Sequence, residues 1–239
     1  MIQTVRQSLR VTERELRFFR TSWRATGFST FVAPVLFLVA LGLGLGGLVD
    51  EPASFGDLSY LEYIAPGLLV GASAQMAAGS GLWPIMAGHR WLGFHRAMVS
   101  SPIRAPEVVV GWLLWVAVRS LGQASVFLAM ATLLGGVRSW WGLAAVAVAG
   151  LTAMAVTAPI MAFTATQDSD WSFDPLMQAV VTPLYLFSGV FFATDSLPLV
   201  VAWVVRLFPL WHGIELAASS GPGPTSASAP ARCRARAET

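Results

Sequence analysis

Long apolar runs alternate with short polar segments over most of the chain. Five of these runs are long enough to be membrane-crossing helices, each of which needs about 20 predominantly apolar residues. They cover residues 28–49, 63–86, 107–134, 142–164 and 175–192. None of them alternates between apolar and polar positions in the way that the strands of a membrane β-barrel do. The pattern therefore predicts an all-α membrane protein with five spans.

Residues 1–27 form a different kind of element. Apolar side chains are expected on one helical face, at Val5, Leu9, Leu16, Phe19 and Trp23. Arginines recur every three or four positions on another face, at Arg6, Arg10, Arg14, Arg17, Arg20 and Arg24. A basic amphipathic helix of this kind typically lies in the membrane interface. We expect residues 1–27 to form such an interfacial helix.

The pattern weakens after the fifth span. The apolar stretch 199–205 is short and is bounded by Pro198, Arg206 and Pro209. Stretches of this length favour a re-entrant segment over a full crossing, and we expect it on the external side. Residues 217–239 are rich in Gly, Pro, Ser and Ala without a hydrophobic face, a composition that predicts a disordered tail.

Composition supports the membrane class and excludes several functions. Of the residues, 55% are hydrophobic and 12% are charged, about half the charged share of a soluble domain. All 15 basic residues are arginines, so the chain lacks the lysine that a Walker A loop requires. The single cysteine, Cys233, excludes a disulfide framework. His89 and His95 are six residues apart, which is not the spacing of a helical metal pair, and no metal site is predicted.

Arginine placement predicts the orientation. The N-terminal segment and the connections 87–106 and 165–174 carry nine arginines, whereas the opposite connections carry one, Arg138. The positive-inside rule therefore places the N-terminus in the cytoplasm. Tryptophans near the predicted span ends fit an interfacial aromatic belt: Trp83, Trp91, Trp112, Trp140, Trp141 and Trp171.

The connection between the second and third spans has its own pattern. Trp91, Phe94 or His95, and Met98 are three to four residues apart, so a short helix can bury one face there. Arg90 and Arg96 would point elsewhere. Pro106 and Glu107 then suit the start of the next helix. An ordinary positive-inside loop explains the same segment equally well.

Three polar residues fall inside predicted spans. Arg119 lies about 18 Å along its span at 1.5 Å per residue, where an arginine costs at least ~2.5 kcal/mol on insertion scales. Gln123 lies one turn further on, and Gln75 lies in the second span. These residues either line a path for an anionic lipid or glycan, or make structural polar contacts. The carboxylates Asp168, Asp170 and Asp174 share one loop and favour a solvated helix-capping cluster over a cation site.

Three stretches resemble the permease subunits of ABC-2 type exporters. They are "YIAPGLLVGASAQ" (63–75), "MVSSPIRAPEVVVGWLLW" (98–115) and "TPLYLFSGVFFATDSLPLVVAWVVRLFPLWHGIEL" (182–216). The third is the most specific, with Ser-Gly-x-Phe-Phe followed by Leu-Pro and Pro-Leu-x-His. The similarity extends over about residues 10–216. It is closest to nodulation-type lipooligosaccharide exporter permeases and to daunorubicin-resistance permeases.

The resemblance implies an ABC-2 transmembrane domain over residues 28–216, in a multi-pass protein of the bacterial plasma membrane. It implies a permease that moves an amphipathic or lipid-linked substrate outward, either lipooligosaccharide-like or drug-like. The chain itself would have no enzymatic activity and no cofactor. Two copies of a separate ATPase subunit would bind ATP and Mg, and a second permease chain would complete a homodimer or heterodimer among membrane lipids, without nucleic acid.

The resemblance also assigns a role to the segment 89–104. In that family the corresponding cytoplasmic segment is a coupling helix that docks on the ATPase subunit. Carried onto this sequence, the docking residues are Arg90, Trp91, Phe94, His95, Arg96 and Met98. The family usually has a sixth span. In this sequence the predicted disordered tail, residues 217–239, stands where that span is expected.

Alternatives to an exporter permease remain open. A secondary transporter or channel is one, although proton coupling usually needs acidic residues inside spans, and Glu62 and Glu107 lie only at span edges. An enzyme acting on lipids is another, although no catalytic set is visible. A non-functional truncated permease is the third.

Overall fold

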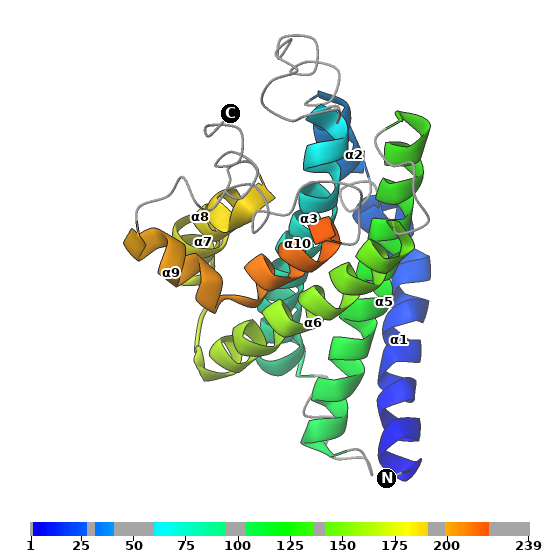
Figure 1. The fold of residues 1–239 in the computed structure, drawn as a ribbon. Coiled ribbons are helices and arrows are strands. Elements are labelled where there is room, and N and C mark those ends of the chain that lie inside the picture. Colours follow the sequence, from blue (N-terminus) through cyan, green and yellow to red (C-terminus); the bar gives the residue numbers. More distant parts are fainter. Residues whose placement is uncertain are drawn as a thin grey trace, which may run out of the picture.

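The described part of the chain folds into helices only. In the computed structural model the described residues are 2–27, 32–40, 60–93, 104–135, 142–190 and 199–219. Every regular element within them is an α-helix or a π-helical turn, and the long helices pack together in a bundle (Figure 1). The all-α class predicted from the apolar runs is confirmed.

The elements follow the chain in this order: α1 Ile2–Gly27, α2 Ala33–Val39, α3 Tyr60–Met86, η3 Ala87–Trp91, α5 Ala105–Leu133, α6 Gly142–Thr166, α7 Phe173–Leu176, η4 Met177–Val181, α8 Thr182–Tyr185, η5 Leu186–Val190, α9 Leu199–Leu207 and α10 Pro209–Ser219. Much of the predicted first span, 28–49, and most of the predicted tail, 217–239, lie outside the described residues. The boundaries proposed for the interfacial helix, the transmembrane domain and the tail stay predictions.

Two of the described helices meet the length and hydropathy needed to cross a membrane. They are α5, with 29 residues, and α6, with 25 residues. Both coincide closely with predicted spans, 107–134 and 142–164. The number of spans, five by the sequence pattern, stays a prediction.

Helices α3 and α6 pack along each other in the same direction. The Thr157 hydroxyl lies 3.0 Å from the Ala77 carbonyl oxygen, and the Thr164 hydroxyl lies 2.8 Å from the Gly81 carbonyl oxygen, as hydrogen-bond donors. Each hydroxyl is also within hydrogen-bond distance of a carbonyl one turn back in α6. Both threonines are buried, so these bonds satisfy polar groups that solvent does not reach. The C-terminal ends of α3 and α6 therefore lie together.

Residues 173–190 return along α3 in the opposite direction. Phe173 packs with Met86 at the end of α3, whereas Val190 lies against Gly67 near its start. Helix α5 also runs against α3 (Figure 1). The end of α3, the start of α5, the end of α6 and the start of 173–190 thus share one end of the bundle, which we call the Arg90 end.

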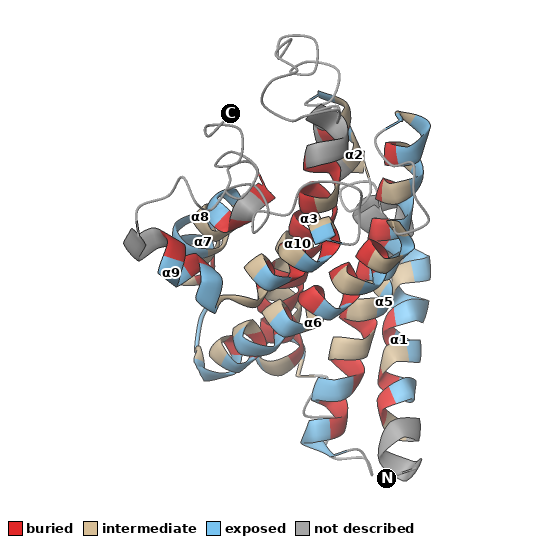
Figure 2. Ribbon diagram, viewed as in Figure 1, coloured by how far each residue is buried: buried red, intermediate tan, exposed pale blue. Residues whose placement is uncertain are grey.

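The core lies where α3, α5, α6 and α10 meet. Its fully buried members are mostly small or aliphatic, among them Leu68, Ala74, Ala124, Ala149 and Ile214. Figure 2 shows buried residues concentrated on the inward faces of these helices, with exposed residues on their outer faces. Small side chains allow membrane helices to approach closely.

Helix α1 packs along the first half of α5, and the two helices run in the same direction. The Thr12 hydroxyl donates a hydrogen bond of 2.9 Å to the Gly111 carbonyl. The rings of Phe19 and Trp115 meet edge to face, with centroids 5.7 Å apart. Glycine at position 111 allows the backbone of α1 to come this close, because a Cβ there would lie 2.7 Å from the Ser8 carbonyl oxygen.

The face of α1 that packs on α5 includes only part of the predicted apolar face, namely Phe19. Ser8, Val11 and Glu15 are buried, whereas Leu9 and Leu16 remain exposed. The periodicity of apolar residues did not predict that Ser8 and Glu15 would be buried. An exposed apolar face beside an arginine face is typical of a helix at the membrane interface, and the interfacial position of α1 stays a prediction.

The predicted fifth span, 175–192, corresponds to the described helix over 173–190. It alternates between α and π turns. Pro183 has no N–H to donate, and the Thr182 hydroxyl donates to the Met177 carbonyl at 2.9 Å beside it. Hydropathy predicted the element, but not its irregular winding.

The segment after residue 198 forms two short helices. α9 and α10 contain 9 and 11 residues and are separated at Phe208. Arg206 lies over the ring of Trp211 across this break, with its Cζ 5.7 Å from the ring centroid. At 1.5 Å per residue neither helix alone approaches the ~30 Å of a bilayer core. The re-entrant, external position of this segment stays a prediction.

One tryptophan of the predicted aromatic belt, Trp112, is buried between helices. Trp112 is only 4% exposed, and its indole Nε1 donates a hydrogen bond of 3.2 Å to the Ser80 carbonyl in α3. A buried indole is stable there because its N–H finds an acceptor. The prediction that Trp112 anchors the chain at the membrane interface is wrong.

Candidate functional site

The segment that follows α3 begins as a π turn. In η3 the Leu92 N–H donates to the Ala87 carbonyl at 2.8 Å, which widens the last turn by one residue. Gly93 then adopts φ +65°, a left-handed conformation that glycine reaches without strain and that ends helices. Residues 89–92 consequently extend beyond the bundle from a fixed helix end.

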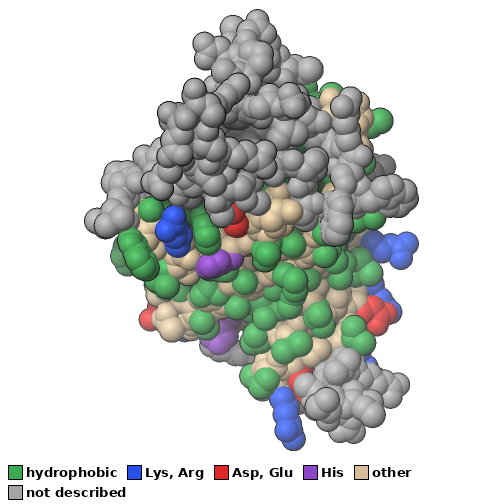
Figure 3. Space-filling view, in the orientation of Figure 1, with side chains coloured by type: hydrophobic (Ala, Val, Ile, Leu, Met, Phe, Trp, Pro, Cys, Tyr) green, Lys and Arg blue, Asp and Glu red, His purple; other side chains and the backbone are tan. Residues whose placement is uncertain are grey.

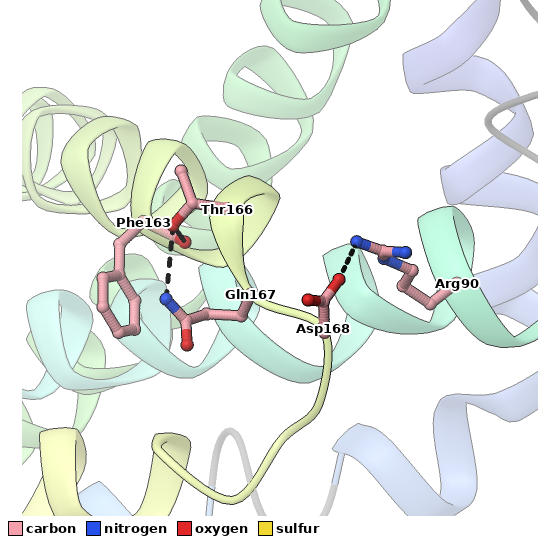
Figure 4. Close-up of polar contacts among 5 residues, drawn as sticks. All are labelled: Arg90, Phe163, Thr166, Gln167 and Asp168. Atoms are coloured by element: carbon pink, nitrogen blue, oxygen red, sulfur yellow. Dashed lines mark hydrogen bonds and ion pairs between the residues drawn. The ribbon is translucent and has the colours of Figure 1, made fainter.

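Arg90 forms an ion pair with Asp168, from the connection between α6 and α7 (Figure 4). The two residues are 78 positions apart in sequence. Asp168 therefore pairs with another segment, while 87% of its side chain remains exposed to solvent. Arg90, predicted to protrude, instead connects the segment after α3 to the connection 167–172.

The connection 167–172 is itself held to the end of α6. The Gln167 side-chain amide donates to the Thr166 hydroxyl at 3.2 Å, and the Thr166 hydroxyl donates to the Phe163 carbonyl at 2.7 Å (Figure 4). The Ser172 hydroxyl donates to the Gln167 side-chain oxygen at 3.2 Å. These bonds fix the backbone from which Asp168 reaches Arg90.

An apolar cluster supports both segments from beneath. Leu82, Met86 and Phe173 are buried together at the Arg90 end. The rings of Trp83 and Phe173 meet edge to face at 5.9 Å. Since the cluster joins α3 to α7, the two segments rest on one packed base.

The structure places only part of the predicted docking set. Arg90 and Trp91 are exposed, with Trp91 at 56%, and His89 is half-buried. Phe94, His95, Arg96 and Met98 lie outside the described residues. Their part in docking stays a prediction, as do the roles of Arg90 and Trp91.

The next helix begins as the sequence predicted. α5 starts at Ala105, with Pro106 in its first turn. The buried Glu107 carboxylate accepts a hydrogen bond of 2.9 Å from the Arg104 backbone N–H. A carboxylate in this position satisfies an N–H that the helix leaves unpaired and complements the helix dipole.

The predicted polar path is partly buried. Arg119 and Gln75 are half-buried, and Gln123 is buried one turn after Arg119 in α5. The Gln123 Oε1 has no hydrogen-bond donor among the described residues. A buried amide oxygen of this kind costs about 1–3 kcal/mol, so a polar partner at this position would stabilise the site. Whether the three residues line a path stays a prediction.

The outer surface suits a membrane. Figure 3 shows hydrophobic side chains over much of the visible described surface, with charged side chains mainly toward its margins. Exposed large apolar residues on α5 and α6 include Val110, Val118, Leu143 and Leu151. No group of three His, Cys, Asp or Glu residues that could hold a metal ion occurs within the part of the chain that the structure describes.

Sequence comparison identifies the class to which this arrangement belongs. Residues 6–220 match the ABC-2 type transporter family, and the chain belongs to that family. It is therefore an integral membrane permease, a domain that has no ATPase activity of its own. The family resemblance stated from the sequence is confirmed.

Individual relatives are distant. The chain is 27% identical over 201 residues to Nodulation protein J of Rhizobium leguminosarum bv. trifolii, covering 82% of this chain and 75% of the relative. It is 26% identical over 201 residues to Nodulation protein J of Rhizobium meliloti (strain 1021), with the same coverage. The protein of that name from Neorhizobium galegae is 26% identical over 188 residues, covering 77% and 69%. No solved structure matches.

Proposed function

We propose that the chain is the permease half of an ATP-driven exporter in the bacterial plasma membrane. The observation that carries this proposal is the family match over residues 6–220. ABC-2 permeases work with an ATPase, and this chain has no lysine for a Walker A loop. Two copies of a separate ATPase subunit supply ATP and Mg binding, and a second permease chain completes the transporter.

The Arg90 end is the side on which the ATPase docks. Residues 87–93 and the connection 167–172 lie together there, joined by the ion pair between Arg90 and Asp168. In the sequence, the N-terminal segment and the connections 87–106 and 165–174 carry nine arginines, which favours a cytoplasmic position. The segment 89–104 contacts the ATPase, with Arg90, Trp91, Phe94, His95, Arg96 and Met98 as its docking residues.

The substrate is amphipathic or lipid-linked, either lipooligosaccharide-like or drug-like. The motif 182–216, which resembles nodulation-type lipooligosaccharide exporters, and the relatives named Nodulation protein J support the first class. Arg119, Gln123 and Gln75 provide polar groups within otherwise apolar helices. They suit an anionic or hydroxyl-rich part of such a substrate.

Docking is tested by replacing Arg90, Trp91, Phe94 and Arg96 together with alanine. The variant should lose co-purification with the ATPase, identified by its Walker A peptide, and remain in the membrane fraction. The matched control is Trp203→Ala with Arg206→Ala, which removes an exposed aromatic residue and an arginine from α9. Unchanged co-purification of the fourfold variant would refute the docking assignment.

Orientation is tested at the single cysteine. With five spans and a cytoplasmic N-terminus, Cys233 is external. A membrane-impermeant maleimide should then label it in intact cells, or in protoplasts where a wall blocks access. Labelling that requires lysis would instead place the tail in the cytoplasm and contradict the five-span topology.

A further inference from the structure

The break between α9 and α10 brings together one aromatic and three ionisable side chains. Arg206 lies over the Trp211 ring, with its Cζ 5.7 Å from the ring centroid. The rings of Trp211 and His212 meet edge to face, with centroids 4.9 Å apart. Glu215 follows Trp211 by one turn of α10 and therefore shares its side of the helix. We call these four residues the α9–α10 cluster.

The α9–α10 cluster lies away from the packed side of α10. That packed side consists of the buried residues Leu210, Gly213, Ile214 and Ala217. By contrast, Arg206 and His212 are exposed, and Trp211 and Glu215 are half-buried. The four side chains therefore present aromatic and polar groups to whatever lies outside this bundle.

α10 packs across α3 and α6 on the half of the bundle remote from the Arg90 end (Figure 1). Its buried residues share one apolar cluster with Ile64 and Leu68 of α3 and with Ala145 of α6. These residues lie in the first halves of α3 and α6, whereas both helices end at the Arg90 end. With a cytoplasmic Arg90 end, as proposed above, the α9–α10 cluster lies in the outward half of the permease.

The α9–α10 cluster also lies at membrane depth. Gly213, the residue after His212, lies against Thr152, about 15 Å from the start of α6 at 1.5 Å per residue. Because α6 is long and apolar enough to cross a membrane, this level falls within the hydrocarbon core. Ionisable residues at such a depth almost always face a water-filled cavity or a substrate path, since contact with lipid tails is costly.

The chemistry of the α9–α10 cluster fits a neutral sugar. A sugar ring has an apolar face of C–H groups, which the electron-rich face of an indole attracts, and a rim of hydroxyls. Arg206 supplies hydrogen-bond donors, Glu215 supplies acceptors when ionised, and His212 can supply either. The Glu215 carboxylate repels a phosphate or sulfate group, and the Arg206 guanidinium repels a cation. A neutral, hydroxyl-rich ring complements all four side chains.

We propose that the α9–α10 cluster binds a neutral sugar ring of the exported substrate on its way out of the membrane. The C–H face of the ring packs on the accessible part of the Trp211 indole, and its hydroxyls bond to Arg206, His212 and Glu215. The proposal rests on the proposed function, because it narrows the substrate to the glycan-bearing class. It also gives a role to the Pro-Leu-x-His motif, which contains Trp211 and His212.

The test is binding of the full transporter, held in lipid nanodiscs, to an array of immobilised sugars. The array carries neutral oligomers of glucose, galactose, mannose and N-acetylglucosamine beside phosphorylated and sulfated sugars. We expect binding to at least one neutral oligosaccharide. This binding should change little at high salt, because screening weakens interactions between charges and leaves uncharged contacts in place.

Four variants test whether the α9–α10 cluster is the binding site. Trp211→Leu should weaken binding about tenfold, the order expected for loss of one aromatic contact, whereas Trp211→Phe keeps a ring and should retain most of it. His212→Ala should also weaken binding, and its exposed position leaves the packing intact. The matched control is Trp171→Leu, at an indole that is 77% exposed at the Arg90 end, which should bind normally. The Tm of each variant checks folding.

Each other result has a defined meaning. Binding to no neutral oligosaccharide, while the ATPase still co-purifies with the permease, would overturn this proposal and leave the proposed function standing. Binding only to charged sugars, lost at high salt, would overturn it in favour of an anionic ligand. Equal binding by the wild type, Trp211→Leu and His212→Ala would place the sugar elsewhere and overturn it too. Absence of any ATPase from the purified wild-type transporter would instead overturn the proposed function.

Discussion

Gly213 in α10 lies directly against Thr152 in α6. A Cβ at position 213 would lie 2.1 Å from the Thr152 Oγ1, 2.9 Å from its Cγ2 and 3.0 Å from its Cβ. The neighbouring residues Leu210, Ile214 and Ala217 are buried on the same side of α10. The absence of a side chain at position 213 therefore allows α10 to dock on α6.

Gly213→Ala should destabilise the permease by about 1–3 kcal/mol, the usual cost of overpacking a core. The expected readout is a lower Tm of the detergent-solubilised protein. Combining it with Thr152→Ala should recover most of the loss, because the clash is with that side chain. Gly79→Ala is the control: a Cβ there meets nothing within 4 Å, and its Tm should not fall.

Gly111→Ala should release α1 from α5. The new Cβ would lie 2.6 Å from the Val11 Cβ and 2.7 Å from the Ser8 carbonyl oxygen. Release would expose α1, so trypsin should cleave after its arginines several-fold faster in membranes. Gly122→Ala, on the same helix with open space around it, should leave the cleavage rate unchanged. Equal cleavage of both variants would contradict the role of this close contact.

Glu15→Gln should remove a pH dependence from α1 docking. Burial against α5 raises the pKa of Glu15 above its ordinary value of 4.5, despite its ion pair with Arg14. The folded chain then binds the proton more tightly, so stability is greatest below pH 4.5 and is lost as pH rises through the raised pKa. The variant should flatten the Tm profile over this range and raise Tm at neutral pH. Glu13→Gln, on the exposed face of α1, should leave the slope in place.

Gln123→Leu should affect the stability of the permease and its transport activity differently. The Gln123 Oε1 is buried without a donor among the described residues, so an apolar replacement of similar size should maintain or raise Tm. If Gln123 lines the substrate path, export should fall in the same variant. Ser125→Ala, on the exposed side of α5, is the control for export. Unchanged export by Gln123→Leu would exclude a path role for this residue.

Local patterns predicted local structure well. The proline and the carboxylate at positions 106 and 107 predicted the start of α5, because capping depends on residues within one turn. Uninterrupted apolar runs predicted α5 and α6 within a few residues. The helical nature of residues 1–27 followed from periodicity alone.

Contacts between distant segments could not be predicted in this way. The close approach of Ser8 and Val11 to α5 depends on Gly111 in another helix. The pair between Arg90 and Asp168 joins residues 78 positions apart, and only their opposite charges in two connections of the same predicted side could have suggested it.

The paired packing of α3 and α6 has a mechanical consequence. Thr157 and Thr164 bind α3 carbonyls at two successive levels, and the ion pair at residue 90 adds a third connection just beyond the helix ends. α3 has 27 residues and is about 40 Å long. These contacts oppose sliding of the C-terminal half of α3 against that of α6. We therefore expect a displacement of residues 87–93 to move the C-terminal halves of both helices together.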